Sequence, residues 1–259
     1  MIVIVDFGSQ TTHLIGRRIR ELGVRTEIVE PEKALAKIAS LKPAGIILSG
    51  GPASVYASGA PTVDPQIFKL DIPLLGICYG EQLMSHMLGG QVKPGRKKEY
   101  GPAEIATTSS DLFTGIPKTT FTVWMSHGDE VQQAPTGFKT VATTKTIPHA
   151  AIENKTKKQY GIQFHPEVVH TQFGEMVLSN FITICKLKTK KRVINEAFVN
   201  DIVEDIKESI PEKDSVICAL SGGVDSSVAA LLVHRAIGKR LTCIYIDSGL
   251  MRKGETDDL

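Results

Sequence analysis

The sequence predicts an α/β protein with an open, mixed sheet flanked by helices, followed by the first βαβ unit of a second, doubly wound domain. Short apolar runs typical of buried parallel strands alternate with helical patterns along most of the chain. A charged stretch at residues 186–192 interrupts this alternation, which then restarts. With 259 residues, of which 42% are hydrophobic and 22% charged, the chain is long enough for one or two full cores.

The first predicted elements follow one another at short intervals. Residues 2–5 form an apolar run, and apolar residues at helical spacing follow over residues 14–22. Further apolar runs predict buried strands at residues 24–29, 45–48 and 72–77. The last of these strands enters a predicted helix over residues 80–88, which ends at the pair Gly89 and Gly90.

From about Gly101 to Phe164 the pattern changes to short β-rich segments separated by Gly, Pro and Lys turns. We expect these segments to extend the sheet in mixed sense, with strands at residues 121–125, 140–144, 150–153 and 160–164. A helix is expected over residues 172–187. We therefore assign residues 1–188 to a first domain and residues 189–259 to a linker helix and an incomplete second domain.

The second domain begins with a predicted amphipathic helix. Apolar residues recur at every fourth position between charged ones, at Ile194, Phe198, Ile202, Ile206 and Ile210. The predicted βαβ unit then consists of a strand, a helix and a second strand, at residues 215–220, 225–237 and 241–246. Because two parallel strands and their helices cannot bury both faces of a sheet, we expect this part to be a fragment of a larger domain.

Composition and charge exclude several classes of function. The 30 Lys and Arg residues and 28 Asp and Glu residues leave a net charge of +2, which argues against nucleic acid as the main partner. No apolar run approaches the roughly 20 residues of a membrane helix, and the N-terminus lacks the basic region of a signal peptide, so we expect a cytoplasmic protein. The four cysteines contain no C-x-x-C pair, which argues against disulfides and a structural metal.

One cysteine lies in a motif typical of nucleophiles. Gly76-Ile77-Cys78-Tyr79-Gly80 has the G-x-nucleophile-x-G form at the junction of a predicted strand and helix. The flanking glycines allow a strained turn that points the sulfur toward the positive end of the following helix, where a thiolate is favoured. This context predicts that Cys78 is a nucleophile. The alternative is a buried apolar cysteine.

Candidate partners for this cysteine follow other predicted strands. His165 and Glu167 are two residues apart, hence on the same side if the chain is extended there, and an imidazole oriented by a carboxylate is the base that a cysteine needs. Without the cysteine they would be an ordinary solvated strand end. Residues 49–52, S-G-G-P, offer backbone N–H groups that could form an oxyanion hole with the amide of Tyr79, or could be a plain glycine turn.

These motifs, with W-M-S-H-G-D at residues 124–129, resemble in their order the class I (triad) glutamine amidotransferase domain over about residues 1–188. The resemblance implies a flavodoxin-like fold and hydrolysis of glutamine to glutamate and ammonia through a γ-glutamyl thioester, with no cofactor for this step. It implies a catalytic triad of Cys78, His165 and Glu167 and oxyanion donors at Gly51 and Tyr79.

The same resemblance implies that glutamine is held by Gln82, Ser126, His127 and Asp129. Taken alone, the S-H-G-D segment would most simply be a polar turn after a strand ending at Met125. The chain departs from the family pattern at Glu81, where an apolar residue, often Met, is expected. This carboxylate could raise the pKa of the thiol if it faces Cys78, and is favourable in the first helical turn if it faces solvent.

A second candidate site lies in the second domain, between the predicted strand and helix. Its sequence is Ser221-Gly222-Gly223-Val224-Asp225-Ser226-Ser227, whose N–H groups and hydroxyls can hold a phosphate at a helix N-terminus. It lacks the lysine of the G-x-x-x-x-G-K-[ST] loop. The motif resembles the pyrophosphate loop of the N-type ATP pyrophosphatases, within an adenine-nucleotide α-hydrolase-like domain, and residues 244–255 resemble that family's second strand and loop. The alternative is a merely capped helix start.

The two resemblances together imply a ligase that uses glutamine, ATP and Mg²⁺. It would adenylate xanthosine monophosphate (XMP) and replace the adenylate with ammonia, and the full-length enzyme would be a homodimer. We expect this chain alone to perform at most the glutaminase half. The alternatives are a catalytically silent glutamine-binding or scaffold subunit of a separate synthetase, and a generic flavodoxin-like binder with an accidental elbow.

Overall fold

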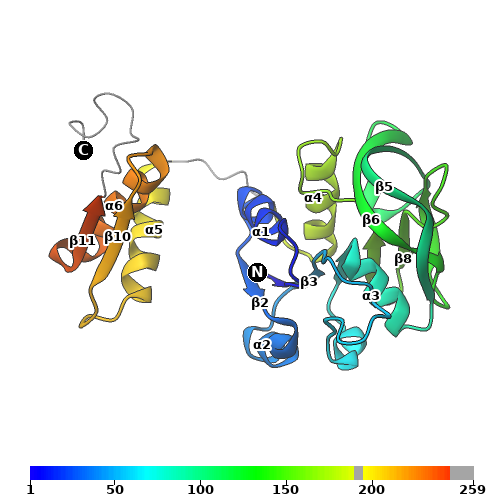
Figure 1. Cartoon of the computed structure of the whole chain (residues 1–259), viewed down its shortest axis with the longest axis horizontal. Helices are drawn as coiled ribbons and strands as arrows, with labels where there is room; N and C mark the ends of the chain where they lie inside the picture. Colours follow the sequence, from blue (N-terminus) through cyan, green and yellow to red (C-terminus); the bar gives the residue numbers. More distant parts are fainter. Residues whose placement is uncertain (190–194, 246–259) are drawn as a thin grey trace. The chain divides into compact units, whose positions relative to one another are not determined.

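The computed structural model of the chain describes residues 1–189 and 195–245 and divides into two compact units, Met1–Arg192 and Val193–Leu259. Figure 1 shows both units in sequence colours, and each is described by itself below. Part of the charged stretch at residues 186–192, which carries the predicted boundary, lies outside the described residues. Within the described ranges, no helix is both long and apolar enough to cross a membrane.

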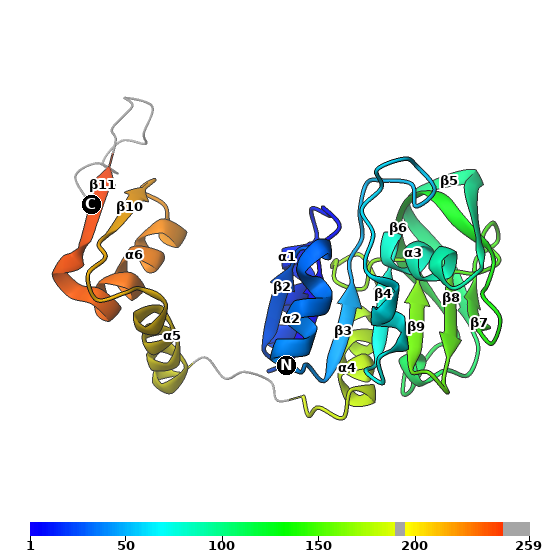
Figure 2. The same ribbon diagram turned by 90° about the horizontal axis from the view of Figure 1, so that it is seen from below.

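In the first unit, the described strands form a nine-stranded sheet in the order β2-β1-β3-β4-β9-β8-β7-β5-β6 (Figure 2). Five neighbouring strands are parallel: β2 (Thr26–Val29), β1 (Ile2–Val5), β3 (Gly45–Leu48), β4 (Leu74–Ile77) and β9 (Gln159–Ile162). Their central members are buried along their whole length, as expected for strands covered by helices on both faces. The predicted open mixed sheet with flanking helices is confirmed.

The remaining strands are antiparallel: β8 (Ala151–Asn154), β7 (Lys139–Thr143), β5 (Gln91–Thr107) and β6 (Thr120–Gln133). Two predicted limits here are wrong. The β-rich region begins at Gln91 and not near Gly101, and the strand predicted to end at Met125 continues to Gln133. The reason is that β5 pairs with β6, with a register shift between Pro94 and Glu99. This pairing holds polar residues in the sheet although their sequence is typical of turns.

Helices cover both faces of this sheet. On one face, α1 (Thr12–Glu21) and α4 (Gly174–Ile184) pack their apolar residues against the strands. On the other face lie α2 (Ala34–Leu41) and α3 (Tyr79–Met87). The sequence analysis did not predict α2, which has only eight residues. As a result, each face of the sheet has its own apolar core.

The second unit contains α5 (Glu196–Ser209), β10 (Val216–Leu220), α6 (Val224–Ile237) and β11 (Leu241–Tyr245), with the two strands parallel. Several of its apolar side chains are exposed, namely Ile217, Val224, Val228, Leu231 and Ile244. Of the predictions made for this unit, Ile194 and nearly all of the segment at residues 244–255 lie outside the described residues.

Candidate active site

The turn from β4 into α3 has the geometry of a nucleophile elbow. Cys78 has φ 52° and ψ −108°, a strained conformation for a residue with a side chain. Both flanking glycines are required by close backbone contacts. A Cβ at Gly76 would lie 2.6 Å from the carbonyl oxygen of Gly80, and one at Gly80 would lie 2.3 Å from the carbonyl oxygen of Leu48. The turn therefore fixes the sulfur at the carboxyl edge of the parallel strands.

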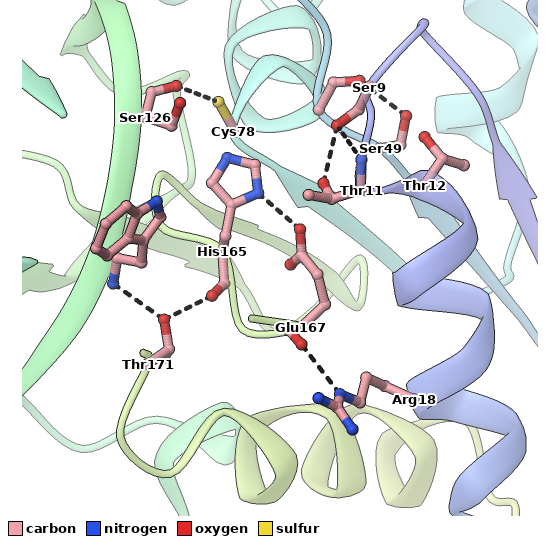
Figure 3. Close-up of polar contacts among 12 residues, drawn as sticks. Ser9, Thr11, Thr12, Arg18, Ser49, Cys78, Ser126, His165, Glu167 and Thr171 are labelled. Carbon is pink, nitrogen blue, oxygen red and sulfur yellow. Dashed lines mark hydrogen bonds and ion pairs between the residues drawn. The ribbon is translucent and has the colours of Figure 1, made fainter. Parts of the chain in front are cut away.

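The sulfur of Cys78 lies at the wall of a cavity of about 770 Å³. Its residue is 5% exposed, and Sγ is 3.6 Å from the backbone carbonyl oxygen of Ser126 on β6 (Figure 3). Tyr79 is the first residue of α3, where backbone N–H groups have no carbonyl partner within the helix. These N–H groups and the helix dipole favour negative charge near the sulfur.

His165 and Glu167 lie next to this cysteine, as the motif predicted, but on a loop. Strand β9 ends at Ile162, so the extended conformation assumed for residues 163–167 is not the reason for their contact. His165 Nδ1 and Glu167 Oε1 are 2.7 Å apart, and both residues are buried. In Figure 3 the imidazole lies between the sulfur and the carboxylate.

The environment of His165 favours its charged form. Burial by itself lowers the pKa of the imidazole, but hydrogen bonds with Cys78 and Glu167 outweigh this effect and raise the pKa to about 10. An imidazolium beside a cysteine stabilises the thiolate, which is the nucleophilic form of the sulfur. The arrangement is therefore suited to attack on a carbonyl carbon, followed by proton transfer from His165 to a leaving group.

The Ser49–Pro52 segment packs directly on the elbow. A Cβ on Gly51 would lie 2.8 Å from the carbonyl oxygen of Phe7 and 3.3 Å from the ring of Tyr79, so only glycine fits here. The hydroxyl of Ser49 accepts a hydrogen bond from Phe7 N and donates one to Gly50 O. These contacts hold Gly51 beside the first turn of α3.

The predicted glutamine-holding residues all line the cavity, but the side chains of Gln82, His127 and Asp129 have hydrogen-bond partners within the protein. Gln82 Nε2 donates to the carbonyl oxygen of Asp129 at 2.8 Å and to Gln163 Oε1 at 2.9 Å. His127 Nδ1 is 2.9 Å from the same carbonyl, and burial lowers the pKa of His127. The polar-turn alternative for S-H-G-D is wrong because these residues belong to β6.

Other cavity residues were missed by the sequence analysis. The loop after β1 contributes Gly8, Ser9, Gln10 and Thr11, and the opposite wall contains Lys98, Tyr100 and Trp124. Tyr56 lies farther out and donates from Oη to Asp129 Oδ1 at 2.8 Å. The rule that sites form at the carboxyl ends of parallel strands could have identified the β1 loop, because it follows a buried strand.

Glu81 points into the protein and not toward solvent. Its residue is 0% exposed, and neither carboxyl oxygen has a hydrogen-bond partner among the described residues. Burial, with a smaller contribution from the charge of Cys78, raises the pKa of Glu81 well above its ordinary value. The solvent-facing alternative is therefore wrong.

The serine-rich loop of the second unit joins β10 to α6. Gly222 has φ 79°, and the hydroxyls of Ser221 and Ser226 lie 3.1 Å apart. Ser226 and Ser227 each donate from Oγ to the carbonyl oxygen of Gly223, at 2.9 and 3.0 Å. A loop with hydroxyl and N–H donors at the start of a 14-residue helix fits an anionic phosphate.

Two family models match the chain. Residues 3–185 match the model described as glutamine amidotransferase class-I, and residues 214–257 match the model described as tRNA methyl transferase HUP domain. The first match covers the nine-stranded sheet except for Ile2, and all the cavity residues named above.

Curated relatives align with both units of the chain. The chain is 51% identical over 260 residues to the glutamine-hydrolyzing GMP synthase of Carboxydothermus hydrogenoformans, and 49% identical over 258 residues to that of Staphylococcus carnosus. These alignments cover 100% and 99% of this chain but 50% of each relative. The chain thus spans about half the length of the curated relatives it matches.

Solved structures support the same grouping. A protein from Thermoplasma acidophilum, described as one subunit of a GMP synthase, has a TM-score of 0.65 and 34% identity, and the match covers 71% of this chain and 93% of that one. A glutamine amidotransferase from Methylobacillus flagellatus, with 14% identity and a TM-score of 0.56, has a similar fold.

Proposed function

The chain belongs to the class-I glutamine amidotransferase family, and we propose that its first unit is the glutaminase of a glutamine-hydrolysing GMP synthase. One observation carries the proposal: a cysteine held at φ 52° on an elbow lies against a buried His165–Glu167 pair. A strained backbone at this point has a purpose if the sulfur must be presented to a substrate.

In the proposed reaction, the Cys78 thiolate attacks the carboxamide carbon of glutamine. The N–H groups of Gly51 and Tyr79 stabilise the negative charge on the oxygen of the tetrahedral intermediate. His165 gives its proton to the leaving nitrogen, and ammonia departs as the γ-glutamyl thioester forms. Water then attacks the thioester carbon and gives a proton to His165, which restores the imidazolium while glutamate and the thiolate are released. Glu167 keeps the ring oriented throughout.

Glutamine would be held in the cavity by groups that remain open after the internal hydrogen bonds are made. Among the described residues, the hydroxyl of Ser126 and Asp129 Oδ2 meet this condition, whereas Asp129 Oδ1 accepts from Tyr56 and Gln82 Nε2 is already engaged twice. We therefore assign Gln82 and the His127 ring to shaping the β6 wall, and Asp129 to the glutamine amino group.

Ammonia from this reaction would aminate an XMP adenylate made from ATP in the synthetase half. The loop at residues 221–227 would hold ATP phosphates, with Asp225 as its acidic side chain and Mg²⁺ accompanying the nucleotide. Ammonia would displace AMP from the adenylate to give GMP. The whole enzyme is proposed to be a homodimer, and this chain alone is expected to perform the glutaminase step and to form no GMP.

The test is glutamate release from glutamine by the purified chain, beside Cys78→Ala, with and without ATP. Turnover that is lost in Cys78→Ala supports the proposal. If turnover is absent but glutamine protects Cys78 from alkylation, the site is formed and binds glutamine, and its turnover requires the synthetase half. If glutamine neither turns over nor protects, the glutaminase proposal fails and a catalytically silent role takes its place.

A further inference from the structure

The backbone of His165 is tied to strand β6 through the side chain of Thr171. The N–H of Trp124 donates to Thr171 Oγ1 at 3.0 Å, and this hydroxyl donates to the carbonyl oxygen of His165 at 2.6 Å. The N–H of His165 in turn donates to the carbonyl oxygen of Trp124 at 3.0 Å. Figure 3 shows Thr171 between the strand and the loop. The three hydrogen bonds form a closed ring.

Strand β6 also contacts the proposed nucleophile, Cys78. Ser126, two residues after Trp124 on this strand, places its carbonyl oxygen 3.6 Å from Cys78 Sγ. Cys78 and His165 are far apart in the sequence, yet both contact β6 within three residues, at Ser126 and Trp124. A displacement of His165 from this strand would therefore change its distance from the sulfur directly.

Other contacts hold the loop on either side of His165. It lies beyond the end of β9, and the N–H of Gln163 donates to the carbonyl oxygen of Ala150 at 3.0 Å. On the side of α1, Arg18 Nε donates to the carbonyl oxygen of Glu167 at 3.0 Å, which anchors the carboxylate residue. Thr171 is 6% exposed, so its hydroxyl has no solvent to replace a lost partner.

This proposal rests on the glutaminase function proposed above. We propose that Thr171 is a positioning residue for His165: the hydroxyl of Thr171 keeps the imidazole of His165 at hydrogen-bonding distance from Cys78. Its oxygen contacts no reacting atom and acts only through the backbone of His165. Without the hydroxyl, the buried His165 carbonyl and the partly buried Trp124 N–H would both lose this partner, and the loop would shift to relieve this. A shift of about 1 Å at a catalytic group can reduce the rate about 100-fold.

The test compares Thr171→Val, which has the same shape without the hydroxyl, with Thr171→Ser, which keeps it. Thr171→Ala is a second hydroxyl-free variant in case valine does not fold. Ser110→Ala is the matched control, because Ser110 is also 6% exposed and its hydroxyl donates to the carboxylate of Glu153 away from the site. Ser110→Ala shows how much the loss of a buried hydrogen bond lowers stability when the site itself is not changed.

Two readouts are used. The first is the pH profile of Cys78 alkylation by iodoacetamide, followed on the Cys78 peptide by mass spectrometry so that the other cysteines do not interfere. The second is kcat and KM for glutamine. In Thr171→Val we expect alkylation at pH 6 and kcat each to fall about tenfold, with KM nearly unchanged. Thr171→Ser and Ser110→Ala should match the unmodified chain.

The proposal is overturned if the hydroxyl-free variants keep the alkylation profile of the unmodified chain, if Thr171→Ser loses reactivity as they do, or if Ser110→Ala shows the same loss. The alkylation readout needs no turnover. If glutamine neither turns over nor protects Cys78 from alkylation, the proposed function fails, while the role of Thr171 is still decided by the reactivity of Cys78.

Discussion

Two ionisable side chains lie within one turn of α3, and both are buried. Cys78 begins the turn, and Glu81 follows three residues later with its side chain over Gly161 of β9, where a Cβ would lie 2.7 Å from Glu81 Cγ. The carboxyl group has exchanged water for apolar surroundings without gaining a partner among the described residues, a change that strongly disfavours its charged form. Glu81 therefore keeps its proton to a higher pH than an exposed glutamate does.

This raised pKa predicts that Glu81 destabilises the first unit increasingly as pH rises. The stability linked to its proton is complete below pH 4.5, the ordinary value, and is lost as pH rises toward the folded-state pKa. Glu81→Met and Glu81→Gln should therefore raise the free energy of unfolding at pH 7.5 by about 1–3 kcal/mol. Urea unfolding between pH 5 and pH 8 measures the effect, which should shrink toward pH 5.

Glu32→Gln provides the control, because Glu32 is exposed on the same unit and its substitution should leave the free energy of unfolding unchanged at every pH. A stability gain in Glu81→Met that does not vary with pH would show that packing, and not ionisation, distinguishes the two residues. A loss of stability at pH 7.5 would mean that the carboxylate has a stabilising partner.

At the scale of elements, the elbow depends on how closely α3 approaches β3. Gly80 lies in the first turn of α3, and its Cα is close enough to Leu48 that a methyl group would overlap the strand's backbone. Backbone atoms of a central strand cannot move aside as a flexible side chain can. The glycine is thus required by packing between elements, in addition to any preference of the turn itself.

We expect Gly80→Ala to lower the free energy of unfolding by more than about 2 kcal/mol and to reduce Cys78 alkylation, because the helix must move away from β3. Gly16→Ala in α1 is the matched variant. Its Cβ would meet the flexible end of Arg20 at 3.0 Å, and alanine is the better helix former, so stability should change by less than about 1 kcal/mol. Thermal unfolding measures the stability of both variants, and an equal loss of stability in Gly80→Ala and Gly16→Ala would contradict this account.

The parallel half of the sheet could be predicted from sequence, but most of the antiparallel half could not. Strands β3 and β4 are continuous apolar runs between turns, a pattern that local residues determine. Lys93 and Pro94 of β5 have no such pattern around them, and they are in the sheet because they pair with Glu130 and Asp129 of β6. The limits of these two strands therefore depend on contacts that the sequence does not display.

The same division applies to the candidate site. Cys78, His165 and Glu167 lie in compact motifs, and the structure brings them together as the motifs predicted. Tyr56 and Thr171 lie in ordinary-looking segments and form long-range hydrogen bonds with Asp129 and Trp124, so nothing in their local sequence distinguishes them. Whether a predicted glutamine contact is already occupied, as for Gln82, is likewise visible only in three dimensions.

At the scale of the whole molecule, the two units differ in how completely they bury their apolar residues. Both apolar cores of the sheet lie within the first unit and are built from residues between Ile2 and Cys185. In the second unit, only Ala230 and Ile237 are among the buried apolar residues described. The first unit therefore has what a domain needs to fold by itself.

This difference predicts that residues 1–189 fold without the rest of the chain. The shortened protein should unfold cooperatively, and its midpoint should lie within about 3 °C of the corresponding transition in the full chain. Differential scanning calorimetry of the two proteins measures this. A shortened protein that is unfolded, or that has lost Cys78 reactivity, would show that the second unit is needed to complete the first.

The strained backbone of Cys78 affects which residues are stable at this position. A residue held at φ 52° costs about 1–3 kcal/mol, and glycine would relieve most of that strain. A copy of this protein released from catalysis would therefore gain stability by replacing its cysteine with glycine, a single change. Because most random substitutions destabilise a fold, such a gain would be readily retained. In the proposed glutaminase, a strained cysteine at the elbow would thus lower stability in exchange for activity.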